Sequence, residues 1–273
     1  MVIDGRAIAD EIVDNAKKVA LTLPGVPSFV ALAVSPSAAT NSYLRIKERQ
    51  AARAGVSMEV LSLPEESSTE EVVEAILSDT HDAVIVQLPL PPHIDLQAVL
   101  AAIPVEKDAD VLSPSARSVG LVMHPIVHAV KTILEQTNTL PAGLRAVVIG
   151  KGWLVGQPVA DWLTQAGVEV TVVTRESGDI AALTRSADLI VSGAGVSELV
   201  TPEMVHPGAV VIDVGTSELG GSLRGDVAPA VAEIAGVFTP VPGGVGPIAV
   251  AYLMENVVAL AQAKRLQGPQ KAV

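Results

Sequence analysis

Short apolar runs alternate with amphipathic segments along most of the 273-residue chain. Strand-length apolar runs occupy residues 31–35, 57–63 and 83–90. Segments with helical periodicity occupy residues 42–54, 69–77 and 96–103, and Asp95 is placed to cap the last of these. Strands that alternate with helices form βαβ units, so the first part of the chain predicts a mostly parallel sheet.

A second cycle of the same kind begins after a turn predicted at residues 140–143. Its strands are predicted at residues 145–150, 168–174, 187–195, 208–215 and 236–242, with helices at 157–166 and 180–186. A short frayed tail is predicted from residue 266. The fold class predicted from this pattern is α/β with two domains.

Composition narrows the kind of protein. Hydrophobic residues make up 49% of the chain but aromatic residues only 2%, so the core is expected to consist of Ala, Val, Leu and Ile. A net charge of -12 argues against nucleic acid and anionic membranes as partners. The chain has no cysteine, its start lacks the pattern of a signal peptide, and its apolar runs fall short of the roughly 18 residues that a membrane helix needs. A soluble cytoplasmic protein with a small ligand is expected.

The strongest local motif joins the strand at 145–150 to the following helix. Gly150, Gly152 and Gly156 form G-x-G-x-x-x-G, one residue longer than the usual dinucleotide fingerprint, and Pro158 fits a helix start. Such a turn lets a pyrophosphate approach the amides at a helix terminus. The alternative is an ordinary tight turn between a strand and a helix.

Charged residues follow the next strand, where dinucleotide folds select the ribose. Arg175 could pair with a 2′-phosphate, whereas Glu176 could accept a hydrogen bond from a 2′-hydroxyl, and Lys151 adds a cation. Arg175 and Lys151 favour NADP, with NAD possible. Both charged residues after the strand could instead belong to a solvated loop end.

Candidate catalytic groups lie in the first half of the chain. Tyr43 and Lys47 are four residues apart, hence on one helical face, where the lysine could move a proton, unless it is simply solvated. Gln87 ends an apolar strand and either faces a ligand or bonds a neighbouring loop. Asp108 and Asp110 lie in a predicted loop, where acidic residues are common.

His124 and His128 have the spacing of metal ligands on a helix. Pro125, however, predicts that the helix starts between them, and no third ligand is evident. Structural or rim roles are therefore expected, and no metal site is predicted.

Several segments, in this order, resemble the bifunctional methylenetetrahydrofolate dehydrogenase and methenyltetrahydrofolate cyclohydrolase family. They are DGRAIADEI, SYLRIK, VQLPLPPHID, EKDAD, GKGWLVGQP, ADLIVSGAG, GAVVIDVG, GDV and TPVPGGVGPI, and they cover nearly the whole chain. The resemblance implies a folate-binding catalytic domain (1–118 and 246–273), a Rossmann-type NAD(P)-binding domain (119–245), a folate cleft between them and a homodimer. It implies oxidation of 5,10-methylenetetrahydrofolate with NADP, then hydrolysis to 10-formyltetrahydrofolate, in one-carbon metabolism and purine biosynthesis.

The resemblance also implies roles for individual residues. Lys47 would be the cyclohydrolase lysine, assisted by Gln87, with Tyr43 bordering the pterin and Asp110 binding its amino edge. The remaining substrate-binding residues would be Pro242, Gly243, Gly244 and Pro247, in a loop that returns the chain to the first domain, with Pro247 starting the last helix. The cofactor-binding residues would be Gly150, Lys151, Gly152, Val155, Gly156, Pro158, Arg175, Gly193, Gly195, Gly215 and Thr216.

Four segments depart from the family's pattern. Val111 replaces a glycine, His124 replaces a threonine, Gly152 stands in GKG where the family has GRS, and Ala249 replaces a residue with a hydroxyl. The loop carrying Asp110 must therefore change its backbone course or tolerate a branched residue. A form with only one of the activities, and a non-catalytic binding relative, remain as alternative hypotheses.

Overall fold

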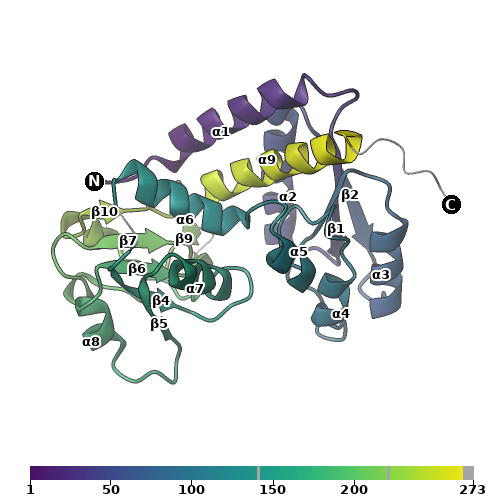
Figure 1. Ribbon diagram of the computed structural model, residues 1–273. Coiled ribbons are helices and arrows are strands. Elements are labelled where there is room, and N and C mark those ends of the chain that lie inside the picture. The colour runs from purple at the N-terminus through teal and green to yellow at the C-terminus, as the bar shows by residue number, and fades with distance from the viewer. Residues whose placement is uncertain (140–141, 220–221, 267–273) are drawn as a thin grey trace. The chain divides into compact units, whose positions relative to one another are not determined.

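The computed structural model (Figure 1) describes residues 1–139, 142–219 and 222–266. Part of the turn predicted at 140–143, and the tail after residue 266, lie outside the described residues. The chain forms two compact units: Met1–Ala9 with Ile126–Ala249, and Asp10–Pro125 with the segment from Val250 onward. The boundaries fall within three helices, α1 (Gly5–Ala20), α6 (Pro125–Gln136) and α9 (Val245–Leu266).

The unit of Asp10–Pro125 is built on a three-stranded parallel sheet. Its strands are β1 (Ser28–Val34), β2 (Ser57–Leu63) and β3 (Ala83–Val86), in the order β2-β1-β3. Its helices, besides parts of α1 and α9, are α2 (Ala38–Ala54), α3 (Thr69–Ser78), α4 (Leu96–Ala101) and α5 (Pro114–Val119). The predicted alternation is confirmed, but β3 is shorter than the apolar run at 83–90, because the prolines that follow cannot donate to a ladder.

Side-chain caps fix where these helices begin. The hydroxyl of Ser68 and the carboxylate of Glu71 form a capping box at α3. Asp95 accepts from the amides of Gln97 and Ala98 at 2.9 and 3.1 Å, which confirms the cap predicted for α4. The short helix α5 was not predicted; Ser113 caps it and Pro114 occupies its first turn.

The other unit contains a five-stranded parallel sheet. Its strands, in the order β10-β7-β6-β4-β5, are β4 (Arg145–Ile149), β5 (Glu169–Val173), β6 (Leu189–Ser192), β7 (Val210–Asp213) and β10 (Val237–Phe238). The connections contain α7 (Gly156–Gln165), α8 (Ile180–Arg185), and the 3₁₀ turns η1 (Pro202–Met204) and η2 (Pro229–Glu233). A hairpin of β8 (Ser217–Leu219) and β9 (Ser222–Arg224) was not predicted.

The two sheets share one topological feature. In each, the strand that comes first in the sequence, β1 or β4, lies between the two strands that follow it. The chain therefore leaves the first strand in one direction and returns past it in the other, and right-handed crossovers put the two connections on opposite faces. Ligands of open α/β sheets bind at the carboxyl ends of the strands at such a reversal.

Aliphatic side chains fill the cores, as the composition predicted. One core cluster of the five-stranded unit joins β4, β6 and β7 to the segments around η1 and η2, with Val147, Ile190, Val200, Val211 and Val231 among its members. Ile180 and Leu183 of α8 pack against it, so α8, η1 and η2 share a face of the sheet.

The last helix, α9, is apolar along most of its length. By length and hydropathy it could cross a membrane, but 61% of the relevant window is buried inside the protein. Within the unit of Asp10–Pro125, Asn256 of α9 donates to the carbonyls of Ala109 and Met123, and Arg265 pairs with Asp82 at 3.1 Å. α9 is therefore a core helix, and it begins at Val245 rather than at the predicted Pro247.

Candidate active and nucleotide-binding sites

Lys47 and Gln87 meet at the reversal point of the three-stranded sheet. Gln87 follows β3, and Lys47 lies on α2, which follows β1. The Nζ of Lys47 donates to Oε1 of Gln87 at 3.1 Å, and Nε2 of Gln87 donates to the carbonyl of Leu88 at 2.9 Å. The amide is thus fixed by its second bond, so the lysine is held in place while two of its donor positions remain for a ligand.

Asp110 lies beside this pair. The segment before it runs parallel to β3, with a bridge between Val84 and Asp108, so Asp110 reaches the same carboxyl edge. Burial raises the pKa of the Asp110 carboxyl, while the charge of Lys47 opposes that shift. A carboxyl in this setting can either donate or accept a hydrogen bond at a ligand.

The loop after Asp110 is held from within. Asp108 is 1% exposed and its carboxylate accepts from the amides of Leu112 and Ser113 at 3.2 and 2.7 Å. Burial raises its pKa, against those bonds. Val111 has φ of 55°, so the loop tolerates a branched residue in the left-handed region, the second of the two outcomes expected at this position.

The other candidates on this unit differ in exposure. Tyr43 shares a face of α2 with Lys47 and is 38% exposed, so its ring is available to a ligand. His124 is 8% exposed, and among the described residues neither ring nitrogen has a hydrogen-bond partner. Burial, and then the charge of Arg117, lower its pKa to about 3.

His128 lies inside α6, while His124 precedes it, so the two do not share a helical face. Burial is the main cause that lowers the pKa of half-buried His128. Within the residues that the structure describes, no three His, Cys, Asp or Glu side chains gather in a way that could hold a metal.

The glycine motif lies at the reversal point of the five-stranded sheet, between β4 and α7. Gly150 has φ of 101°, and a Cβ there would come within 2.7 Å of the Gly193 carbonyl. A Cβ on Gly156 would clash with the Gly150 carbonyl, whereas one on Gly152 would meet open space. Gly150 therefore allows the glycine loop to approach the loop at Gly193, and Gly156 allows the start of α7 to pack closely on the glycine loop itself. Pro158 is buried in the first turn of α7 after the N-cap Val155.

Charged side chains lie in this loop and in the turn after the neighbouring strand. Lys151 is exposed, and Arg175 and Glu176 are both exposed in the turn after β5. That turn is shaped by Thr174, whose amide donates to Ser177 at 2.9 Å and whose hydroxyl accepts from the amide of Glu176 at 3.3 Å. Since β5 adjoins β4, the turn and the glycine loop follow neighbouring strands.

The loops after β6 and β7 carry Gly193, Gly195, Gly215 and Thr216. Gly193 packs so closely on Val155 that a Cβ would clash with it. These loops are organised by two buried aspartates that sequence reasoning missed, Asp213 and Asp226. Burial raises the pKa of Asp213 to about 7, although the amides of Val227 and Asp226 donate to it. Two features of the sequence could have pointed to these residues: Asp213 ends the apolar strand VVID, and Asp226 lies in the short GDV motif.

The loop of the last glycine cluster closes the same unit. The amide of Gly244 donates to the Pro240 carbonyl at 2.7 Å, and the Gly243 carbonyl accepts from Gly5 at 2.9 Å. Pro242 is exposed and Gly243 has φ of 111°. Pro247 and Ala249 fall within the first turns of α9. The loop thus has a defined backbone, without a lysine or hydroxyl of the kind that phosphate loops use.

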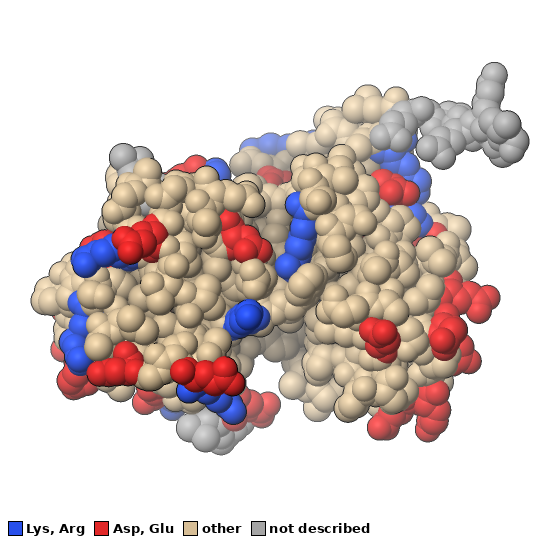
Figure 2. Space-filling view, turned by 60° about the horizontal axis from the view of Figure 1, so that its bottom comes forward, with Lys and Arg blue, Asp and Glu red and all other residues tan. Residues whose placement is uncertain are grey.

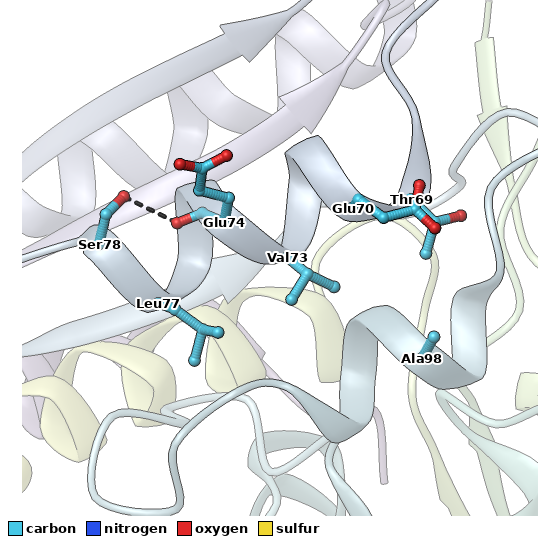
Figure 3. Close-up of a pocket in the computed structure, with 7 residues that line it drawn as sticks. All are labelled: Thr69, Glu70, Val73, Glu74, Leu77, Ser78 and Ala98. Carbon is cyan, nitrogen blue, oxygen red and sulfur yellow. Dashed lines mark hydrogen bonds between the residues drawn. The ribbon is translucent and has the colours of Figure 1, made fainter.

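A separate groove lies between α3 and α4 (Figure 3). Val73 and Leu77 of α3 face Ala98 of α4, with Thr69, Glu70, Glu74 and Ser78 completing the lining. No predicted site residue lines it, its two carboxylates lie on α3, and no lysine or arginine is among the residues that line it. The groove therefore adds no chemistry to the two sites.

Taken together, these sites define a class: a two-unit α/β protein with a dinucleotide-type glycine loop on one sheet and a lysine, amide and carboxyl group on the other. Known proteins agree with that class. The catalytic domain of tetrahydrofolate dehydrogenase/cyclohydrolase matches residues 3–110, and the NAD(P)-binding domain of the same family matches residues 125–265. The chain belongs to the tetrahydrofolate dehydrogenase/cyclohydrolase family.

Individual members of this family are similar to the chain over nearly their full lengths. The bifunctional protein FolD of Methanospirillum hungatei is 38% identical, over 96% of this chain and 98% of its own. The FolD crystal structure from Campylobacter jejuni has a TM-score of 0.91 at 31% identity, covering 97% of this chain and 99% of that one. The Trypanosoma brucei enzyme, solved with NADP and an inhibitor, has a TM-score of 0.91 at 34% identity, covering 97% and 98%. The family and the fold class predicted from the sequence are confirmed.

Proposed function

We propose that this protein catalyses two consecutive reactions of one-carbon metabolism, the predicted NADP-dependent oxidation of 5,10-methylenetetrahydrofolate and the hydrolysis of the methenyl product to 10-formyltetrahydrofolate. The observation that carries the proposal is the Lys47–Gln87 hydrogen bond at a sheet reversal point, in a chain that matches both domains of the family. Full-length relatives named as bifunctional support both activities and do not favour a single-activity form.

The oxidation depends on binding and orientation. NADP accepts a hydride from the methylene carbon when it is bound, and the cation formed is stabilised by the two folate nitrogens that flank it, so no acid or base is required. The glycine turn would receive the pyrophosphate at the start of α7, where the backbone of Gly152 faces open space. Gly193, Gly195, Gly215 and Thr216 belong to the neighbouring loops, and Lys151 supplies a positive charge.

The hydrolysis requires proton movement, and Lys47 supplies it in this proposal. Water adds to the methenyl carbon, the bond from that carbon to one nitrogen breaks, and one proton is released overall. The ammonium of Lys47, held by Gln87, can stabilise the developing oxyanion and pass protons between oxygen and nitrogen. Asp110, whose pKa is raised by burial, would bind the pterin's amino edge, and Tyr43 would border the ring. Pro242, Gly243, Gly244 and Pro247 would contact the folate.

Arg175 is proposed as the residue that selects NADP over NAD. Replacing Arg175 by Ala should raise KM for NADP about tenfold and leave KM for NAD unchanged, because only NADP carries the 2′-phosphate. Initial rates with both cofactors test this. Arg185→Ala, at the end of α8, is the matched control; equal effects of Arg175→Ala on both cofactors would contradict the assignment.

The physiological setting is proposed from the charge of the protein. On the face shown in Figure 2, basic side chains are scattered, some of them beside acidic ones, rather than gathered in a continuous patch. The net charge of -12 also disfavours polyanionic partners. We infer a cytoplasmic enzyme that supplies formyl groups to purine biosynthesis and acts away from membranes. The predicted division into a folate domain (1–118 and 246–273) and a nucleotide domain (119–245) stays a prediction, as does the homodimer.

Two assays test the function directly. Purified protein with methylenetetrahydrofolate should reduce NADP faster than NAD, and the reaction is followed at the absorbance of the reduced nicotinamide. If neither cofactor is reduced, the proposed dehydrogenase activity is wrong. Lys47→Met should abolish formylfolate production from the methenyl compound without weakening NADP binding, with the exposed Lys18→Met as control. If the Lys47→Met variant hydrolyses the methenyl compound as fast as the wild type does, the catalytic role proposed for Lys47 is wrong.

A further inference from the structure

Asp226 makes an unusual set of contacts with one loop of the nucleotide-binding unit. Its side chain is fully buried, and the carboxylate accepts four hydrogen bonds, all from residues 192–196. Oδ2 accepts from the hydroxyl of Ser192 at 2.8 Å and from the amides of Ala194 and Gly195 at 2.6 and 3.2 Å. Oδ1 accepts from the amide of Val196 at 2.8 Å. A residue 30 positions away from Val196 therefore determines the backbone course of this loop.

The carboxylate is itself held rigidly. Asp213, at the end of β7, accepts from the amides of Asp226 and Val227 at 3.1 and 2.9 Å. The amide of Asp213 in turn donates to the hydroxyl of Thr239 at 2.7 Å. Gly215 provides the space, since a Cβ there would clash with the Asp226 carboxylate. The loop is thus fastened to the end of the sheet through a chain of buried bonds.

This arrangement decides which groups the loop can offer to a ligand. Three consecutive amides, of Ala194, Gly195 and Val196, are already bonded to Asp226, so they cannot bind phosphate oxygens. The loop still carries carbonyl oxygens, which accept hydrogen bonds. Ala194, Gly195 and Val196 are exposed, and the loop adjoins the glycine turn at Gly150.

We propose that Asp226 is a positioning residue: by binding the amides of residues 194–196 it makes the loop a subsite for hydrogen-bond donors in the nicotinamide half of the dinucleotide, namely the hydroxyls of the nicotinamide ribose or the carboxamide, and not for its phosphates. This inference rests on the proposed function of the unit as an NADP-binding domain. The phosphates belong to the glycine turn and to the cations Lys151 and Arg175.

Asp226→Asn tests the inference with an almost unchanged side-chain shape. The amide NH₂ cannot accept, so it faces the donors that one carboxylate oxygen satisfied. The dissociation constant for NADP, measured by calorimetry, should rise at least about tenfold, and the amides of residues 194–196 should exchange hydrogen faster. Binding of adenosine 2′,5′-bisphosphate, which lacks the nicotinamide half, should stay within about twofold, as should the cyclohydrolase kcat.

Two further variants make the result decisive. Asp188→Asn removes the same charge from the other end of β6, where Asp188 pairs with Arg145, and should leave NADP binding unchanged. Ser192→Ala removes one donor without changing charge and should weaken NADP binding several-fold; it replaces Asp226→Asn if that variant does not fold.

Each other outcome has a defined meaning. Folded variants that bind NADP as the wild type does would overturn the inference and leave the proposed function intact. Equal weakening of NADP and adenosine 2′,5′-bisphosphate would show a general structural role and overturn the subsite. A wild-type protein that binds no NADP would remove the proposed function, and the inference with it.

Discussion

Val111 and His124 are two residues in energetically unfavourable settings, one because of its backbone conformation and the other because of its burial. Val111 combines a left-handed φ of 55° with a side chain that is only 4% exposed. His124 is buried with both ring nitrogens unpaired among the described residues. Both positions were recognised in the sequence as departures from a family pattern, but their conformation and burial could not be predicted, because they depend on packing partners far along the chain.

At Val111 the usual order of alanine and glycine variants should reverse. Alanine normally stabilises relative to glycine by about 1 kcal/mol, through its methyl group and a smaller unfolded-state entropy. In the left-handed region alanine costs about 1 to 2 kcal/mol that glycine avoids. Val111→Gly should therefore be at least as stable as Val111→Ala in urea unfolding. Val56 is buried and has an ordinary φ, so there the glycine variant should be less stable than the alanine variant. If the glycine variant is the less stable one at both positions, the backbone of Val111 is not strained.

At His124 the stability should depend on pH. The pKa is about 3 in the folded protein and 6.5 ordinarily, so below pH 6.5 the unfolded chain binds a proton that the folded protein does not. Stability is therefore present above about pH 6.5 and is lost as the pH falls, by roughly 2 to 3 kcal/mol at about pH 4.5. His124→Leu should lose less stability over this range in urea unfolding. Identical pH profiles would contradict the lowered pKa, because they would mean that His124 takes up its proton at the same pH in the folded and the unfolded protein.

At the scale of elements, most strands and helices form where the periodicity of the sequence predicted them, whereas α5, the β8–β9 hairpin and the bonds that hold the elements together were not predicted. The capped starts of α3 and α4 were predictable because their caps lie within three residues. The attachment of α9 was not, because Asn256 bonds the carbonyls of Ala109 and Met123, 147 and 133 positions away. In the sequence Asn256 is one polar residue within an apolar helix.

Asn256→Ala should measure that attachment. It leaves two carbonyls without a donor, and Asn256 is 4% exposed, so the variant should lose about 2 to 3 kcal/mol of unfolding free energy. Chemical denaturation followed by circular dichroism provides the measurement. Gln262→Ala, on an exposed position of the same helix, should change stability by less than about 0.5 kcal/mol. Equal costs for both variants would contradict the role of Asn256.

At the scale of the whole molecule, the same strand reversal occurs in both units, and each reversal point carries a candidate site. The five-stranded sheet ends at β5, where Val172 is 38% exposed, and a terminal strand can pair with that of a second copy. If the proposed homodimer forms there, Val172→Lys should shift the protein from dimer to monomer in sedimentation velocity. Val119→Lys, at a 58% exposed position on α5, should not. A wild-type monomer would contradict the homodimer.

The sequence by itself determined the α/β class, the order of most strands and helices, the family, and the candidates Lys47, Gln87, Asp110 and the glycine turn. These features depend on periodicity and on motifs only a few residues long, so they can be recognised from residues that are close together in the sequence. Only the tertiary structure decided that Asp226 takes the amides of residues 194–196, that Asn256 fastens α9, and that His124 is buried. The reason is physical: hydrogen-bond partners and burial depend on which distant segments pack together, and one chain's pattern of polar and apolar residues does not specify those pairs.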